Sequence, residues 1–113
     1  MGKEELLASR SLFENGFYRA SVTQAYFSML SAANALLLKK GISTKTHKGT
    51  FTQLAKEYVK DGLFSKEIYD YLHDGIAIRN DSSYNYSAVF SEEIADELIS
   101  HAEEFLDEVE RLL

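Results

Sequence analysis

The chain has 113 residues, of which 45% are hydrophobic and 27% are charged, a composition typical of one folded domain and not of a disordered segment. Its formal net charge of −6 disfavours a broad basic face for nucleic acid, so any contact with RNA should be local. Cysteine is absent, which excludes a disulfide framework and a zinc–thiolate site and fits a cytoplasmic location. The apolar runs are too short to span a membrane, and we expect no membrane contact.

Apolar residues recur at helical spacing along most of the chain, and proline, which breaks helices, is absent. The first predicted helix covers residues 3 to 14 and ends at Asn15-Gly16, since both residues tolerate the left-handed conformation of a helix stop. A longer helix is predicted from Phe17 to Lys40, with Gly41 after its end. This helix is apolar on nearly all sides, as is typical of a helix buried in a bundle or shared between a core and a dimer interface.

Three further helices are predicted after a polar connector. The first spans about His47 to Lys60, and the second is capped by Ser65 and carries an apolar stripe that ends at Arg79. The last opens with Ser91-Glu92-Glu93, a hydroxyl cap followed by acids in the first turn. The chain shows neither strand alternation nor an internal repeat. It therefore predicts one all-α domain over residues 1–113, an antiparallel up-and-down bundle of four long helices plus one short helix.

The stretch from Ile76 to Tyr86 combines features that occur together nowhere else in the chain. Arg79 places a guanidinium where the helical pattern calls for a core residue. Two phenols, Tyr84 and Tyr86, follow five and seven residues later. A cation on an apolar seam beside titratable groups is typical of a functional site, so we take this corner as the candidate site.

Structural interpretations of the same residues stay open. Arg79 suits the last turn of a helix, where it can satisfy terminal carbonyls or pair with Asp74 or Asp81. The two tyrosines can equally cover the end of the bundle as ordinary loop aromatics. Neither interpretation requires a ligand.

Other polar groups are interpreted in the same way. His47 is expected to cap or precede the third helix, with a ligand role as the alternative. A small basic cluster around one connector is either solvated or meets phosphate or the acidic face of another subunit: Lys39, Lys40, Lys45 and Lys48. The acids of the last helix, with His101, resemble a metal site only loosely, so we predict no metal and no cofactor. The sequence contains no P-loop, no dinucleotide-binding glycine motif and no nucleophile–base signature.

Several segments together resemble the HEPN superfamily, specifically the small stand-alone HEPN proteins that are paired with minimal nucleotidyltransferases. The matching segments are the long helix from Ala20 to Gly41 with its Tyr26-Phe27 pair, Thr46-His47-Lys48-Gly49, and Arg79-Asn80 at the end of the fourth helix. The resemblance covers nearly the whole chain. It implies a homodimer in which two copies of the motif meet in one cleft, and, in active relatives, a metal-independent ribonuclease.

The motif of this family is an arginine, four to six further residues and a histidine, often followed by x-Tyr. Arg79 and Asn80 stand at the positions of the arginine and its polar neighbour, so the resemblance implies that they bind a phosphate or nucleotide. Tyr84, however, stands at the position of the histidine, and Tyr86 matches the tyrosine of the ending. The catalytic pair that remains in this chain is Arg79 and Tyr84.

Replacing the histidine by tyrosine changes the chemistry. RNA cleavage through the 2′-hydroxyl needs a base, an acid and a cation for the charge on phosphorus. An imidazole, with a pKa of about 6.5, can move either proton near neutrality, whereas a phenol with a pKa of about 10 is ionised to roughly one part in a thousand at pH 7. We therefore expect weak or absent cleavage. His73 lies about 120° around the helix from Arg79 and His101 lies on another helix, so neither is expected to replace the imidazole.

These observations lead to three hypotheses. The first is a dimeric HEPN module in a toxin–antitoxin-like or defence pair with a minimal nucleotidyltransferase, in which Tyr86 is the candidate for nucleotidylation. The second is a weak metal-independent ribonuclease that uses Arg79 and Tyr84. The third is a non-catalytic bundle that binds a nucleotide or a protein segment. The hypotheses predict different observations. A nucleotidylated partner module predicts an added nucleotide mass, and a ribonuclease predicts RNA loss that depends on Arg79. A binding bundle predicts neither.

Overall fold

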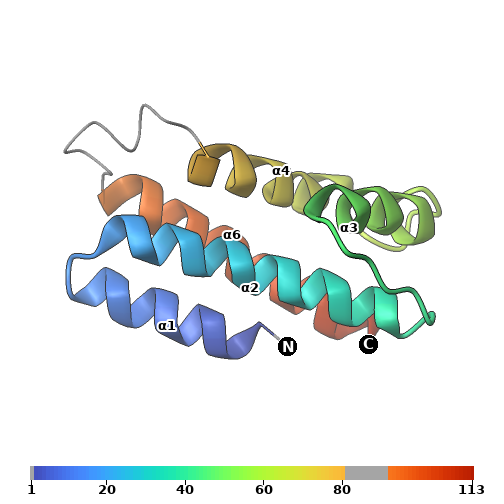
Figure 1. Cartoon of the computed structure of the whole chain (residues 1–113), viewed down its shortest axis with the longest axis horizontal. Coiled ribbons are helices and arrows are strands. Elements are labelled where there is room, and N and C mark those ends of the chain that lie inside the picture. Colours follow the sequence, from blue (N-terminus) through green and yellow to red (C-terminus); the bar gives the residue numbers. More distant parts are fainter. Residues whose placement is uncertain (1, 81–91) are drawn as a thin grey trace.

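The computed structural model describes residues 2–80 and 92–113, and this part of the chain is almost entirely helical (Figure 1). The predicted all-α fold, with four long helices and one short one, is confirmed. The elements are α1 Lys3–Glu14, α2 Tyr18–Leu38, α3 His47–Leu54, the π-helical turn η1 Ala55–Val59, α4 Lys66–Asn80 and α6 Glu92–Leu112. Ser91, the predicted cap of the last helix, lies outside the described ranges. No helix within these ranges is both long and apolar enough to cross a membrane.

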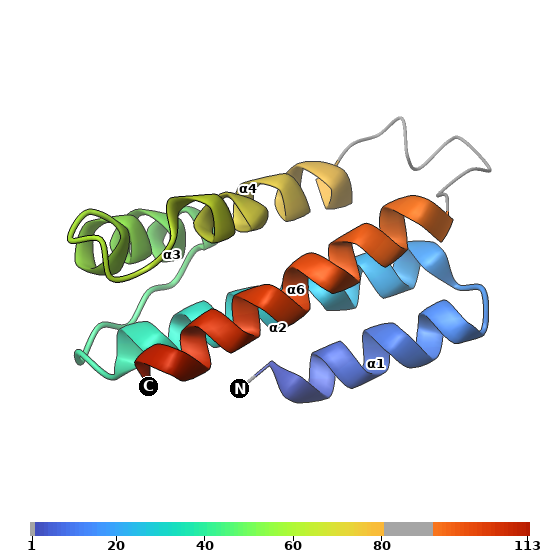
Figure 2. The same ribbon diagram turned by 180° about the vertical axis from the view of Figure 1, so that it is seen from behind.

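Successive long helices alternate in direction, as in the predicted up-and-down bundle. α1 and α4 run one way along the long axis of the molecule, and α2 and α6 run the other way (Figures 1 and 2). α2 lies at the centre, where it contacts α1, α3, α4 and α6. Its apolar character on nearly all sides follows from this position, because each face meets a different neighbour. Leu38, at its last turn, stays 65% exposed.

α1 and α2 are joined by a pair of buried serines. Ser9 Oγ donates to the Ser21 carbonyl at 2.6 Å, and Ser21 Oγ donates to the Ser9 carbonyl at 2.8 Å. Both residues are fully buried. The small side chains let the two backbones approach closely, and each hydroxyl obtains the partner that a buried polar group needs.

α2 ends two residues before the predicted boundary. Gly41, with φ of 76°, provides the left-handed residue that terminates the helix, as predicted. The Gly41 amide donates to the Leu38 carbonyl at 2.9 Å, and the Ile42 amide donates to the Leu37 carbonyl at 3.1 Å. Lys39 therefore belongs to the turn that follows the helix.

Two helix caps and one hydrogen bond to α2 define the segment formed by α3, η1 and α4. Thr46 Oγ1 caps α3 by accepting the amide three residues later, at 2.9 Å. The Tyr58 hydroxyl, in η1, donates to the Leu36 carbonyl of α2 at 3.0 Å. Ser65 Oγ accepts the Ile68 amide at 3.3 Å and so caps α4 as the sequence predicts. The two caps define where α3 and α4 begin, and the Tyr58 hydrogen bond joins the segment between them to α2.

Candidate functional site

α4 approaches α2 closely at Gly75. A Cβ atom at this position would lie 3.1 Å from Met29 Cε and 3.1 Å from Tyr26 Cδ1, both on α2. A glycine inside a helix costs about 1 kcal/mol relative to alanine, and here it allows the two helices to meet. Arg79 follows one turn later on the same face of α4. The close approach at Gly75 therefore places the guanidinium of Arg79 against α2.

The guanidinium of Arg79 lies over two aromatic rings of α2. Its central carbon is 4.9 Å from the centroid of the Phe27 ring and 5.9 Å from that of Tyr26. Contacts of this kind contribute about 0.5–2 kcal/mol, depending on desolvation. Arg79 is half-buried, and no carboxylate among residues 2–80 and 92–113 is close enough to form an ion pair with it. Asp74 is thus not its partner, and Asp81 lies outside the described residues.

Tyr26 connects the arginine to an imidazole. Its side chain is fully buried, and its hydroxyl lies 3.0 Å from Nδ1 of His47. Burial raises the pKa of Tyr26 to about 12, although the positive charge of Arg79 acts to lower it. The phenol therefore stays protonated around neutrality and can donate to Nδ1. The described residues offer this buried hydroxyl no other acceptor, so we assign Tyr26 as the donor and His47 the tautomer that carries its hydrogen on Nε2.

His47 is the first residue of α3, directly after the Thr46 cap. Its ring centroid is 5.6 Å from that of Tyr26 and 6.4 Å from that of Phe27, which it meets edge-on. His47 was expected to cap or precede the third helix, whereas Thr46 is the cap and His47 is the first residue inside the helix. The sequence-based prediction also did not place His47 near the arginine. A signal was present, because the Tyr26-Phe27 pair and the His47 segment were both among the segments that carry the family resemblance. The site thus combines side chains from α2, α3 and α4.

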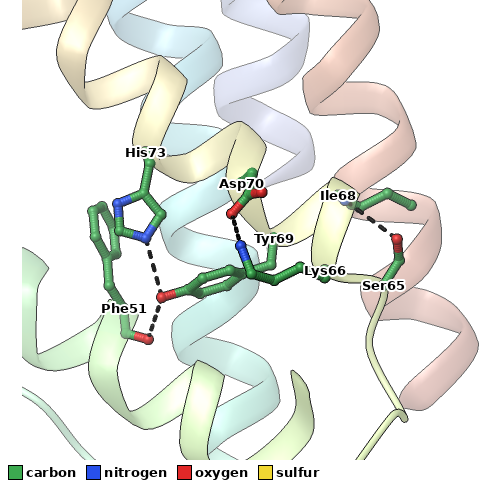
Figure 3. Close-up of polar contacts among 7 residues, drawn as sticks. All are labelled: Phe51, Ser65, Lys66, Ile68, Tyr69, Asp70 and His73. Carbon is green, nitrogen blue, oxygen red and sulfur yellow. Dashed lines mark hydrogen bonds and ion pairs between the residues drawn. The ribbon is translucent and has the colours of Figure 1, made fainter. Parts of the chain in front are cut away.

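The other two imidazoles are engaged elsewhere. His73 Nε2 donates to the Tyr69 hydroxyl at 3.1 Å, because that hydroxyl donates its own hydrogen to the Phe51 carbonyl at 3.0 Å (Figure 3). His101 is stacked on Tyr71, with ring centroids 3.9 Å apart and planes at 1°. Among the described residues, neither ring shares an aromatic partner with Arg79.

Three of the predicted site residues lie at or beyond the end of α4. Asn80 is its last residue and is exposed, so it can reach a ligand beside Arg79. Tyr84 and Tyr86 lie outside the described residues. The catalytic role predicted for Tyr84 and the modification predicted for Tyr86 therefore stay predictions.

Two lysines of the predicted basic cluster make structural contacts. Lys39 Nζ donates to the Leu112 carbonyl of α6 at 2.7 Å. Lys40 Nζ donates to the Glu57 carbonyl at 2.9 Å and lies 4.4 Å from the centroid of the Tyr58 ring. Both tie the end of α2 to its neighbours, which leaves the exposed Lys45 and Lys48 for any ligand.

The opposite side of α4 forms an open hollow with α6. Its polar lining consists of Asp74, Glu97 and His101, so its charge is negative and does not suit a phosphate. Within the described parts of the chain, no three histidine or acidic side chains are arranged to hold a metal ion. The cationic and aromatic chemistry is therefore on the α2 side of α4.

The fold and the site define a class of protein: small helical bundles in which an arginine in the last turn of α4 lies against the central helix α2. A model of the HEPN domain matches residues 1–112, and the chain belongs to the HEPN domain family. This result confirms the family resemblance inferred from the Tyr26-Phe27, His47 and Arg79 segments.

Named relatives agree with this assignment. Two proteins of Methanocaldococcus jannaschii are similar over nearly the whole chain. "Putative toxin MJ0142" is 30% identical over 98% of this chain and 76% of its own length. "Putative toxin MJ0605" is 32% identical over 100% of this chain and 84% of its own length. A Thermotoga maritima protein named "UPF0332 protein" is 31% identical over 98% of this chain and 84% of its own length.

Proposed function

We propose that this chain is the HEPN component of a toxin–antitoxin-like or defence pair, and that it acts by binding RNA or a nucleotide through a phosphate at Arg79. The observation that carries the proposal is a half-buried guanidinium held on the Phe27 and Tyr26 rings with no carboxylate partner in the described residues. Two relatives that are named as putative toxins support the toxin-like role.

The electrostatics favour a local phosphate site. A guanidinium presents several N–H donors in a planar fork that matches two phosphate oxygens. The formal net charge of −6 and the acidic hollow on the other side of α4 repel nucleic acid elsewhere. Arg79 and the exposed Asn80 therefore provide the phosphate contacts at this end of the bundle, without a broad basic face.

The partners are part of the same proposal. We expect two chains to associate so that two Arg79 corners form one cleft, and we expect a minimal nucleotidyltransferase to act on the corner at Tyr86. A phenol is a nucleophile, and a neighbouring guanidinium can hold the incoming phosphate. Exposed apolar side chains, including Leu7 at 67% and Phe17 at 61%, are available for association.

A weak metal-independent ribonuclease is the second candidate function. Tyr84 would donate a hydrogen bond or a proton, and Arg79 would stabilise the charge on phosphorus. A phenol moves protons less readily than an imidazole near pH 7, so any cleavage should be slow. A non-catalytic bundle that binds a nucleotide or protein segment is the third.

One set of variants tests these functions. A mixed RNA pool is incubated in EDTA with the wild type, Arg79→Ala and Tyr84→His, and growth is followed when each is expressed in a host. Arg10→Ala serves as the control, because it removes an arginine whose ion pair with Glu103 joins α1 to α6. We expect no cleavage by the wild type, cleavage by Tyr84→His, and effects on growth that Arg79→Ala abolishes and Arg10→Ala leaves unchanged.

Each other outcome has a defined meaning. Cleavage by the wild type that is lost in Arg79→Ala would establish the ribonuclease in place of the partner module. Growth effects and RNA binding that are the same in Arg79→Ala and Arg10→Ala would refute a phosphate site at Arg79. For the partner, the intact mass of the chain is measured after co-expression with a minimal nucleotidyltransferase. An added nucleotide in the wild type and in Tyr86→Phe alike would refute Tyr86 as the acceptor.

A further inference from the structure

We propose that His47 supplies the imidazole of the Arg79 site, so that one phosphate of the bound RNA or nucleotide lies between the guanidinium of Arg79 and Nε2 of His47. The inference rests on the proposed function in one respect, namely that a phosphate binds at Arg79. It adds a second ligand-binding residue, which lies on a different helix. This residue is not part of the sequence motif that begins at Arg79.

Arg79 and His47 lie against the same two aromatic rings. The guanidinium carbon is 4.9 Å from the centroid of Phe27, and the His47 ring centroid is 6.4 Å from that centroid. Tyr26 contacts both as well, at 5.9 Å and 5.6 Å. A cation at the end of α4 and an imidazole at the start of α3 are thus held at one corner by the side chains of α2.

The orientation of the imidazole leaves one nitrogen for a ligand. Nδ1 is taken by the Tyr26 hydroxyl at 3.0 Å, and Nε2 has no hydrogen-bond partner among residues 2–80 and 92–113. The His47 side chain is half-buried, so its position is defined while a ligand can still reach it. With Tyr26 donating, Nε2 carries the hydrogen and is a donor, which is what a phosphate oxygen accepts.

His73 provides a contrast within the same chain. It also pairs with a buried tyrosine, but its Nε2 is used as the donor to Tyr69 (Figure 3). Its neighbour on α3 is the Phe51 ring at 4.9 Å, and no arginine of the described residues lies over the rings that it contacts. The His73–Tyr69 pair is therefore structural, and His73→Ala is a matched control for loss of an imidazole next to a tyrosine.

The test measures binding of a short fluorescein-labelled single-stranded RNA in EDTA by anisotropy. The proteins are the wild type, Arg79→Gln, His47→Ala and His73→Ala, each checked for helical content. Loss of one hydrogen bond to a charged oxygen should weaken affinity about tenfold or more. We expect this loss in His47→Ala and Arg79→Gln, and less than a twofold change in His73→Ala.

A second measurement follows binding on the wild-type protein itself, and a substituted protein serves only to assign one signal. The imidazole signals of the three histidines are followed by NMR while the same RNA is added to the wild type, with His47 assigned from the spectrum of His47→Gln. The His47 signals should shift on binding, and those of His73 and His101 should not. This comparison separates a ligand contact from a loss of stability.

The two proposals fail in different ways. If Arg79→Gln weakens binding while His47→Ala behaves like His73→Ala and the His47 signals do not move, the His47 inference is wrong and the phosphate site at Arg79 stands. If the wild type does not bind RNA, or Arg79→Gln binds as tightly as the wild type, the proposed function fails and the inference falls with it.

Discussion

Removing the Tyr26 hydroxyl should change stability in a way that depends strongly on pH. Tyr26 is fully buried on α2, and its hydroxyl has His47 Nδ1, at 3.0 Å, as its partner. Tyr26→Phe deletes this hydrogen bond and keeps the ring that supports Arg79. At pH 7 the variant should be less stable than the wild type by about 1 kcal/mol, the usual net contribution of one hydrogen bond.

At high pH the difference should vanish. The folded-state pKa of Tyr26 is about 12, above the value of about 10 for an unfolded tyrosine. Because the unfolded chain loses its proton first, the stabilisation is complete below pH 10 and is lost as pH rises from 10 to 12. At pH 11 the wild type should have lost about 1.4 kcal/mol through this group, and phenylalanine cannot ionise. The two proteins should therefore be equally stable near pH 11, or their order should reverse.

The assay is urea unfolding followed by circular dichroism at pH 7, 9, 10 and 11 for both proteins. Other ionisations affect both chains and cancel in the difference. Tyr18→Phe is the control, because its half-buried phenol has no hydrogen-bond partner among the described residues. A difference between wild type and Tyr26→Phe that stays constant from pH 7 to pH 11 would show that the phenol is not shielded from ionisation, and the reasoning about its burial would be wrong.

Three further substitutions test the scaffold by urea unfolding. Gly75→Ala should destabilise the protein by about 1 kcal/mol and weaken RNA binding. The added methyl group would overpack against the buried Tyr26 ring, and this cost exceeds the gain in helix propensity. A variant more stable than the wild type would refute the close approach of α4 to α2. Thr46→Ala should cost about 1 kcal/mol through loss of the α3 cap, whereas Thr46→Ser should cost much less. The hydrogen bond from Arg111 lowers the pKa of Glu108 in the folded protein. The stability that this bond contributes is therefore complete above the ordinary carboxyl pKa, and it is lost as the pH falls through the pKa of Glu108 in the folded state. Glu108→Gln should therefore cost about 1 kcal/mol at pH 7, and this cost should shrink as the pH is lowered below the ordinary carboxyl pKa; a cost that does not change with pH would contradict this.

Local signals in the sequence determined most of the fold. The Asn15-Gly16 stop, the Ser65 cap and the Gly41 turn each act within a few residues, and each lies where it was predicted. The end of α2 was predicted two residues late, because the lysines after Leu38 continue the helical pattern although the turn to Gly41 already includes them. The π-helical turn η1 leaves no mark in the hydrophobic pattern, since it depends on how the Tyr58 segment meets α2.

The site could be predicted only in part, for a physical reason. Arg79 could be identified from the sequence because it places a charge where the helical pattern of α4 calls for an apolar residue. His47 violates no pattern, since a polar residue at the start of a helix is ordinary. Its contact with Tyr26 joins residues that are 21 positions apart in the sequence and depends on packing of α3 over α2. Neither periodicity nor capping rules contain that information.

The origin of these contacts bears on the predicted replacement of the motif histidine by Tyr84. The described contacts of Arg79 and His47 come from α2, and both residues lie on helices, so none of these contacts is made by the side chain at position 84. We therefore expect binding of a phosphate and transfer of a proton to be separable in this chain. Tyr84→His should add cleavage to a site that already binds, whereas His47→Ala should weaken binding by the same factor in the wild-type background and in the Tyr84→His background. Measuring this loss of affinity in both backgrounds tests whether binding and proton transfer are separate. Unequal losses would mean that His47 and the histidine introduced at position 84 contribute to the same step.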